Sequence, residues 1–295
     1  MPTTVIEYRP PYDVDAMLNF LGRRCIAGVE MVDLSTRTYS RTVTLQQQGK
    51  RHAGWFSARF LNDGTNGLCA VEITISPSLA DARPTVLARV REVLDLDADP
   101  QAINAAMGGS FPGCEGMRVP GTADGFELAV RAVLGQQITV AAARTLAARL
   151  VTQWGPDVQT PFAGLNRVFP SAQTLAAASA QTLGELGMVR QRQKALLGLA
   201  DAVATGRLPL HAGADVQTTL QALQTIAGIG PWTANYIAMR ALRWPDAFVA
   251  GDVALQKALG VRTGSASASA RAAEQASAAW RPWRSYAVIR AWSRL

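Results

Sequence analysis

The stretch LQTIAGIGPWTANYIA, residues 223–238, decides the fold of the larger part of the chain. Apolar residues recur at helical spacing up to its first glycine, so this half predicts a helix that buries one face. Gly228 is expected to end that helix, and Gly230 with Pro231 to begin another, because glycine is favoured after a helix and proline in a first turn. The stretch therefore predicts two helices joined by a tight turn.

The turn has the properties of a phosphate-binding site. Backbone N–H groups at the start of the second helix have no partner within the helix, and they carry the positive end of its dipole. Glycines allow a phosphate to come close to such a backbone. The turn therefore favours contact with a nucleic-acid backbone, while an ordinary pair of antiparallel helices remains the alternative.

The helix after the turn has two different faces. Trp232, Tyr236 and Met239 share one side of it, outside the predicted core face. Two aromatic rings one turn apart, beside a phosphate-binding turn, favour stacking on a base. The predicted core face consists of Ala234, Ile237, Ala238 and Ala241.

The composition is that of a folded, soluble protein, with 48% hydrophobic and 17% charged residues in 295. No long apolar run or signal-peptide pattern is present, so we expect a cytoplasmic protein without a membrane partner. Cys25, Cys69 and Cys114 are too far apart for a disulfide framework or a metal cluster, and His52 and His211 lack a metal-binding spacing. We therefore expect no metal, no cofactor, and catalysis that depends on carboxylates.

The charge of the chain points to a partner. A net charge of +7 and a pI of about 9.8 favour a polyanion such as nucleic acid, because bound cations release counterions from phosphates. A basic surface can also serve solubility alone, so the charge by itself leaves both interpretations open.

The first part of the chain mixes strand and helix patterns. Residues 13–25 predict a helix, and the Asn/Asp/Gly-rich segment 62–67 predicts a hairpin turn. The pattern favours an α+β unit on an antiparallel sheet, which we place at residues 1–95, before a helical region at 96–295. The predicted strands cover 37–45, 52–61 and 68–76.

After Pro84 the patterns are helical. Residues 108–121 are rich in glycine and proline and predict a loop. Asp124 and Glu127 have the spacing of a capping box and are expected to open a helix at Phe126. The other predicted helices cover 85–96, 139–154, 171–185, 189–205, 216–226, 231–243, 253–259 and 270–280.

Several separated motifs together resemble one known family. The pattern L-x-x-I-x-G-I-G-x-W-T-A-N-Y, followed by an aspartate about twenty positions later, resembles the helix–hairpin–helix DNA glycosylase superfamily, and more narrowly the inducible 3-methyladenine DNA glycosylase II type of bacteria. The resemblance implies a two-lobed helical body, with the hairpin at 219–243, one lobe at about 125–244, and the other formed by 96–124 and 245–295. The matching motifs, in family order, cover 9–21, 119–139, 223–242 and 281–292.

The resemblance also implies roles for individual residues. Asp252 matches the catalytic carboxylate of the family. Trp232, Tyr236 and Trp292 match aromatic residues of the base pocket, and Phe20 would reach this pocket from the N-terminal unit.

Further matches concern DNA. Gln136 and Gln137 lie in the loop that would fill the gap in the duplex, and Gln137 is polar where some family members have an apolar wedge. The residues that would hold the DNA backbone are Gly228, Ile229, Gly230 and Thr233.

The chemistry of glycosidic cleavage explains the need for an aspartate. The N-glycosidic bond breaks through an oxocarbenium-like sugar, whose positive charge a fixed carboxylate stabilises. Alkylation of a purine makes it a cationic leaving group that binds well to aromatic faces. Asp252 also precedes a helical segment, so a structural role as its N-cap is the alternative.

The lysines favour a glycosylase that does not cut the strand. Superfamily members with lyase activity have a nucleophilic lysine where this chain has Trp232, and the lysines of this chain, Lys50, Lys194 and Lys257, lie outside the hairpin. We therefore predict a monomeric, monofunctional glycosylase that acts on double-stranded DNA with alkylated bases. The alternatives are a DNA-binding module without catalysis and a glycosylase for oxidised or mismatched bases.

Overall fold

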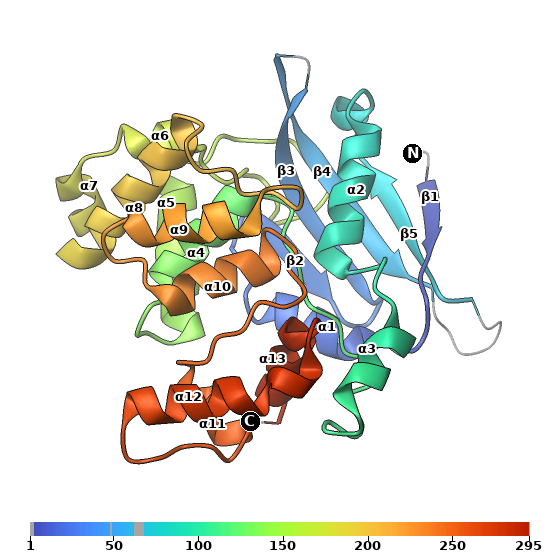
Figure 1. The fold of residues 1–295 in the computed structure, drawn as a ribbon. Coiled ribbons are helices and arrows are strands. Elements are labelled where there is room, and N and C mark those ends of the chain that lie inside the picture. The colour runs from blue at the N-terminus through green and yellow to red at the C-terminus, as the bar shows by residue number, and fades with distance from the viewer. Residues whose placement is uncertain (1–2, 48, 62–67, 295) are drawn as a thin grey trace.

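A computed structural model of the chain describes residues 3–47, 49–61 and 68–294. Its first part is a five-stranded antiparallel sheet with the strand order β1-β5-β4-β3-β2. Figure 1 shows α2 lying along this sheet and α1 near its lower edge. The strands are β1 (Thr3–Glu7), β2 (Glu30–Asp33), β3 (Thr38–Gln47), β4 (Lys50–Phe60) and β5 (Ala70–Ile75), and the helices are α1 (Val14–Gly22) and α2 (Arg83–Leu94).

The predicted sheet is confirmed, with additions. The three predicted segments form β3, β4 and β5, and their alternating apolar residues pack against α1 and α2 in one hydrophobic cluster. The short strands β1 and β2 were not predicted. The predicted hairpin turn at 62–67 lies outside the described residues.

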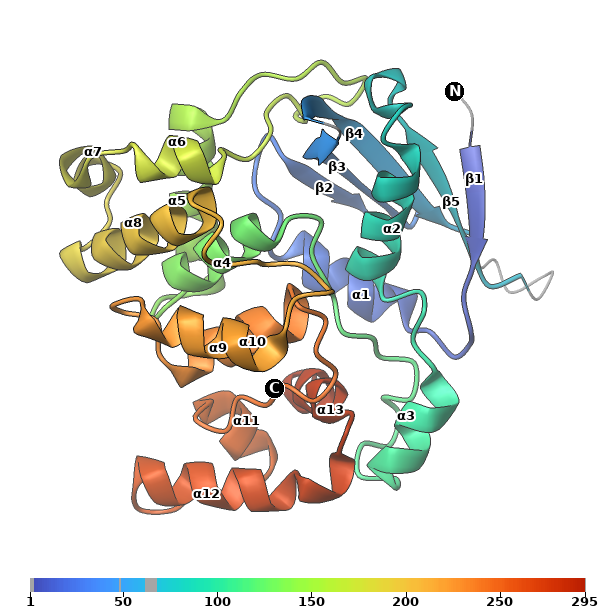
Figure 2. The ribbon, with the colours of Figure 1, turned by 45° about the horizontal axis from the view of Figure 1, so that its top comes forward.

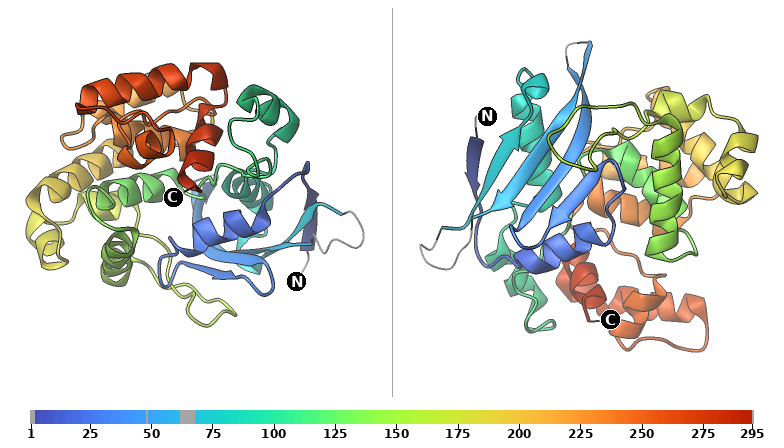
Figure 3. Two further views of the ribbon diagram at one scale, coloured as in Figure 1. Left: turned by 90° about the horizontal axis from the view of Figure 1, so that it is seen from below. Right: turned by 180° about the vertical axis from the view of Figure 1, so that it is seen from behind.

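The rest of the described chain is helical. Figure 2 shows α11, α12 and α13 grouped below the α9–α10 pair, and Figure 3 shows the sheet beside the helical part. The helices are α3 (Pro100–Met107), α4 (Gly125–Leu134), α5 (Val140–Trp154), α6 (Ala172–Ala176), α7 (Ala180–Glu185), α8 (Arg190–Ala204), α9 (Val216–Thr225), α10 (Pro231–Arg240), α11 (Val253–Ala258), α12 (Ala266–Ala276) and α13 (Arg284–Trp292). Overall the fold is α+β, as predicted, while the boundary at residue 95 stays a prediction.

Helix ends account for the differences from the prediction. The segment 171–185 forms two helices rather than one, because Ser179 interrupts it and caps α7 by accepting a hydrogen bond from the Thr182 N–H. In the same way Ser265 starts α12 before the predicted residue 270. Helix α3, which Asp99 caps, and helix α13 were not predicted.

The cap of α4 is confirmed, but the capping box is not. The Asp124 carboxylate accepts hydrogen bonds from the N–H groups of Phe126 (2.8 Å) and Glu127 (3.2 Å). The backbone N–H of Asp124 donates to Thr122 Oγ1 (3.3 Å) instead of to Glu127. The Glu127 side chain points elsewhere, into a buried ionic network.

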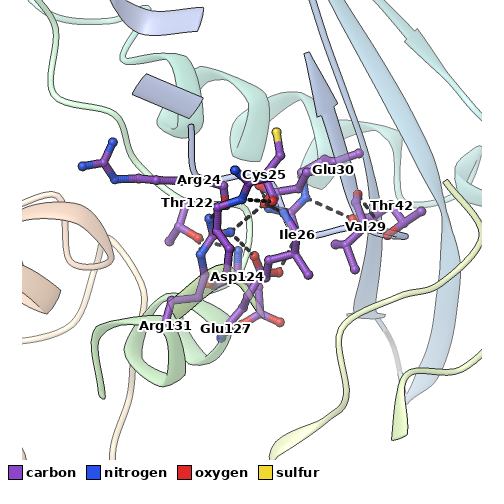
Figure 4. Close-up of polar contacts among 12 residues, drawn as sticks. Arg24, Cys25, Ile26, Val29, Glu30, Thr42, Thr122, Asp124, Glu127 and Arg131 are labelled. Atoms are coloured by element: carbon purple, nitrogen blue, oxygen red, sulfur yellow. Dashed lines mark hydrogen bonds and ion pairs between the residues drawn. The ribbon is translucent and has the colours of Figure 1, made fainter. Parts of the chain in front are cut away.

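This network joins the sheet to α4 (Figure 4). Glu127 accepts from Arg41 of β3 (2.5 Å) and from Arg131 (2.9 Å). Glu30, at the start of β2, accepts from Arg131 (2.7 Å), from Arg41 (3.3 Å) and from the Tyr39 hydroxyl (2.6 Å). Because two carboxylates face two guanidinium groups, the charges balance in an interior that is shielded from water.

Candidate active site

Asp252 lies where three helix ends meet. It is the N-cap of α11, and its Oδ1 accepts a hydrogen bond from the Leu255 N–H (2.6 Å). The indole Nε1–H of Trp292, at the end of α13, donates to the same oxygen (3.1 Å). The indole of Trp232, in the first turn of α10, donates to Oδ2 (2.9 Å). The carboxylate is thus both a helix cap and the acceptor of two tryptophan side chains.

The three predicted pocket aromatics form one cluster. Trp232 and Tyr236, one turn apart on α10, stack with centroids 5.3 Å apart and an interplanar angle of 8°. Tyr236 and Trp292 are 6.3 Å apart and tilted by 44°. One face of Tyr236 is therefore covered by Trp232, and Trp292 lies near the same ring at a tilt.

These side chains border a cavity of about 480 Å³. Of the described residues that line it, Asp252 is the only carboxylate, and four are arginines. A space of this size is typical of small-ligand sites. The residues that line it are Arg24, Ile26, Arg131, Ala132, Gly135, Ile138, Val140, Ala143, Arg144, Ala147, Trp232, Tyr236, Arg240, Asp252, Ala254 and Trp292.

Phe20 lies beside this cavity rather than in its lining. It borders a neighbouring cavity of about 400 Å³, which shares Arg24 and Trp292 with the first. The Arg24 guanidinium lies over the Phe20 ring at 3.7 Å from the centroid, so Phe20 supports a residue that lines both cavities.

The Tyr236 hydroxyl is held by an arginine. Arg240 donates to it (2.6 Å) and is itself fixed by the carbonyl groups of Pro120 (2.8 Å) and Gly121 (3.0 Å). Burial raises the pKa of Tyr236, but the guanidinium groups of Arg240 and Arg24 outweigh burial, so that the net pKa is below the usual value. The Tyr236 oxygen is thus the acceptor of a fixed, positively charged donor.

The helical hairpin has the predicted form. Gly228, after α9, has φ of +92°, and a Cβ there would lie 3.0 Å from the Ala195 Cβ. Gly230 is the N-cap of α10, has no side chain for capping, and a Cβ on it would meet nothing within 4 Å. Ile229 between them is buried.

The other predicted DNA residues differ in exposure. Gln136 donates to the Gly228 carbonyl (2.8 Å) and to Thr233 Oγ1 (3.0 Å), so both side chains serve the hairpin itself. Gln137 is exposed in the turn between α4 and α5, where its φ is +56°. The neighbouring Ile138, which sequence reasoning missed, lines the cavity.

Two predictions about α10 have different outcomes. The predicted core face is buried throughout, at most 4% exposed. Met239, predicted on the outer face, is only 1% exposed, because α10 is covered on that side as well.

The arginines that line the cavity were not predicted from the sequence. Arg240 follows Tyr236 by one helical turn, a signal that was available, whereas Arg24 and Arg131 come from distant segments.

The comparisons with known proteins identify the family of this fold. Residues 3–124 match the family model of the AlkA N-terminal domain, and residues 130–284 match that of the HhH-GPD superfamily base excision DNA repair protein. The chain is 34% identical to DNA-3-methyladenine glycosylase 2 of Escherichia coli K12 over 294 residues, which are 97% of this chain and 95% of that protein.

Solved structures show the same fold. The 3-methyladenine DNA glycosylase from Archaeoglobus fulgidus has a TM-score of 0.80 at 19% identity, covering 98% of this chain and 97% of that chain. The 8-oxoguanine glycosylase/lyase of Clostridium acetobutylicum, solved with double-stranded DNA, has a TM-score of 0.65 at 14% identity, covering 96% and 92%.

No helix of the described residues is long and apolar enough to span a membrane. Taken together, the sheet, the helical hairpin and the matches to both family models have one explanation. The chain belongs to the HhH-GPD superfamily of base excision DNA repair proteins, as a homologue of the DNA-3-methyladenine glycosylase II type with an AlkA N-terminal domain.

Proposed function

We propose that the protein is a monofunctional DNA glycosylase that flips alkylated purines out of double-stranded DNA and releases them by hydrolysis of the N-glycosidic bond. The observation that carries this proposal is the Asp252 carboxylate, held by two indole N–H groups at the edge of an aromatic cavity. We propose alkylated purines such as 3-methyladenine and 7-methylguanine as the substrates, and the family and the aromatic lining of the cavity support this choice.

The aromatic geometry suggests where the flipped base lies. Because Trp232 covers one face of Tyr236, a base that stacks on Tyr236 has to use the opposite face. A cationic purine is attracted by these electron-rich rings. Trp232 then acts mainly by supporting Tyr236 and by orienting Asp252.

The proposed reaction needs no covalent intermediate with the protein. As the bond between C1′ and the purine nitrogen breaks, its electron pair stays with the purine and neutralises the positive charge that alkylation produced. The Asp252 carboxylate stabilises the positive charge that develops on the sugar. Water then adds to C1′ and loses a proton toward Asp252, which leaves an abasic site.

Strand cleavage by a lysine has no support in the cavity. No lysine stands among the described residues that line it, and Trp232 occupies the position where lyases of the superfamily have their nucleophile. Lys194 lies on α8 and Lys257 on α11, outside the lining. A Schiff-base step requires an amine at the reacting carbon, so we propose hydrolysis alone.

The hairpin is proposed to hold the DNA backbone. The fold does not require glycine at position 230, because φ is −94° and a Cβ would point into open space. A glycine that the protein itself does not need is explained by a ligand that approaches the backbone closely. The N-terminus of α10 supplies the N–H groups for a phosphate.

Replacing Gly230 by alanine tests this contact. We expect the affinity for duplex DNA to fall at least about fivefold, because the added methyl group keeps a phosphate away from the first turn of α10. The melting temperature should change by less than about 2 °C, since the site is unstrained. Fluorescence anisotropy with a labelled duplex measures the affinity. Unchanged affinity in a folded variant would remove the hairpin from the DNA interface.

A phenylalanine at position 292 tests the orientation of Asp252. Trp292→Phe keeps an aromatic ring but loses the N–H donated to Oδ1, and we expect the single-turnover rate of base release to fall about tenfold. Trp280→Phe is the matched control, because its indole N–H donates to Ser110 (3.2 Å) in another part of the fold. Equal rates for the two variants would contradict the role of Trp292.

The function itself is tested with a duplex that carries one 7-methylguanine. Excess protein is expected to release free 7-methylguanine and to leave a site that breaks only after treatment with hot alkali. A folded protein that binds this duplex and releases no base would instead be a DNA-binding module.

A further inference from the structure

We propose that Glu30, which lies in the N-terminal sheet and outside the cavity lining, is a positioning residue that fixes one wall of the base-excision cavity. The inference rests on the proposed function, since it concerns the same cavity. It gives the N-terminal sheet a role in catalysis that requires no contact between the sheet and DNA.

One oxygen of the Glu30 carboxylate binds residues that line the cavity. Its Oε2 accepts hydrogen bonds from the backbone N–H of Ile26 (3.2 Å) and from Arg131 Nη1 (2.7 Å). Arg131 Nη2 in turn donates to the Arg24 carbonyl. Arg24, Ile26 and Arg131 all line the cavity, so one carboxylate oxygen holds three lining residues, two directly and one through Arg131.

The other oxygen of the Glu30 carboxylate is anchored to the sheet. Glu30 Oε1 accepts from the Tyr39 hydroxyl (2.6 Å) and from Arg41 (3.3 Å), and both of these residues belong to β3. Strand β3 is an inner strand of the described sheet, between the edge strand β2 and β4. The wall is therefore fastened to a rigid element rather than to another loop.

The part of the cavity wall that Arg24 and Ile26 form needs such an anchor. Arg24 and Ile26 lie between α1 and β2, where turn hydrogen bonds, such as that from the Arg24 N–H to the Leu21 carbonyl (2.9 Å), replace helix and strand pairing. Arg24 carries the guanidinium that lies over Phe20 and contributes to the positive environment of Tyr236. A shift of this segment would therefore change the space available to the base and the setting of the Tyr236 hydroxyl together.

The negative charge of Glu30 helps to hold the cavity wall. Glu30 and Glu127 neutralise Arg41 and Arg131, and all four side chains are largely buried. Burial raises the pKa of Glu30, but Arg131 and Arg41 outweigh it and hold the pKa well below its usual value. The two guanidinium groups thus hold the Glu30 carboxylate in its ionised form.

The test compares Glu30→Gln with a matched control on β3, Ser40→Ala. Glu30→Gln keeps the shape of the side chain but removes the charge that holds Arg131. Ser40→Ala removes the hydrogen bond from the buried Ser40 hydroxyl to Ser57 Oγ (2.8 Å) and leaves every bond of Glu30 intact. Both changes lower stability, but only the first loosens the cavity wall, so the control separates positioning from stability.

The readouts are the single-turnover rate of base release from a one-lesion duplex, the affinity for undamaged duplex, and the melting temperature. We expect Glu30→Gln to lower the rate about tenfold without changing the affinity, because misplaced lining groups affect the reaction and not the hairpin. Ser40→Ala should stay within about twofold of the wild-type rate. If Glu30→Gln does not fold, Glu30→Asp, which withdraws the carboxylate by one methylene group, should show the same selective loss.

The outcomes separate this inference from the proposed function. A wild-type protein without base release would contradict the proposed function. An active wild type with the same rate for the folded Glu30 variant, or with equal losses for the Glu30 and Ser40 variants, would overturn the positioning role and leave the glycosylase proposal intact.

Discussion

Asp252→Asn is expected to lower the rate of base release about a thousandfold, because the neutral amide no longer stabilises the positive charge on the sugar. Asparagine is also a good N-cap, so α11 should stay folded. Binding to damaged DNA should persist, since the hairpin and the aromatic rings are unchanged. Single-turnover kinetics and anisotropy measure the two properties separately.

The chain offers a matched control for this substitution. Asp215 is the N-cap of α9 and accepts a hydrogen bond from the Thr218 N–H (2.8 Å), as Asp252 does from Leu255. Asp215→Asn should release base at the wild-type rate. If Asp252→Asn did so too, Asp252 would be a helix cap and nothing more, and the proposed mechanism would be wrong.

Glu127→Ala is expected to cause the largest loss of stability, about 3–5 kcal/mol, because it leaves buried guanidinium charge without compensation. Glu127 is 1% exposed and pairs with both Arg41 and Arg131. The free energy of unfolding in urea, followed by circular dichroism, measures this effect. The prediction follows from burial, since the same interaction at the surface contributes far less.

Glu72 provides the comparison for an exposed ion pair. It pairs with Arg59 (2.9 Å) across two strands, with 29% and 51% of the side chains exposed. Glu72→Ala should therefore cost less than about 1 kcal/mol. Similar losses for the two variants would show that the network at α4 contributes no more than a surface pair.

Local patterns predicted the parts of the fold that depend on neighbouring residues. The glycine turn before α10, the Asp124 cap and the alternation of β3 to β5 are all encoded within a few positions, and the structure confirms them. Strands β1 and β2 escaped prediction because five and four residues are too few to establish an alternation. Their place at the two edges of the sheet is a tertiary property.

The sequence predicted which residues belong to the site but not the hydrogen bonds between them. Asp252 and three aromatic rings were singled out together through the resemblance to the family, and the structure brings them together. The hydrogen bonds from Trp232 and Trp292 to the carboxylate join residues 20 and 40 positions apart, which no local pattern encodes. Their assigned roles stay predictions.

The ionic network was invisible in the sequence for the same reason. Arg131 and Glu30 are 101 positions apart, and each looks like an ordinary surface charge in its own segment. The capping-box spacing even suggested another partner for Glu127. Only the packing of β2 and β3 against α4 shows that these charges are buried together.

The most direct test of the central claim is a count of released bases against strand breaks in methylated double-stranded DNA. Wild-type protein is incubated with this DNA, free 3-methyladenine and 7-methylguanine are quantified by chromatography, and breaks are scored without alkali. We expect release of methylated purines and no more strand breaks than in DNA incubated without protein. Breaks in proportion to released bases would contradict hydrolysis without lyase activity, and a folded, DNA-bound protein that releases no base would contradict the glycosylase itself.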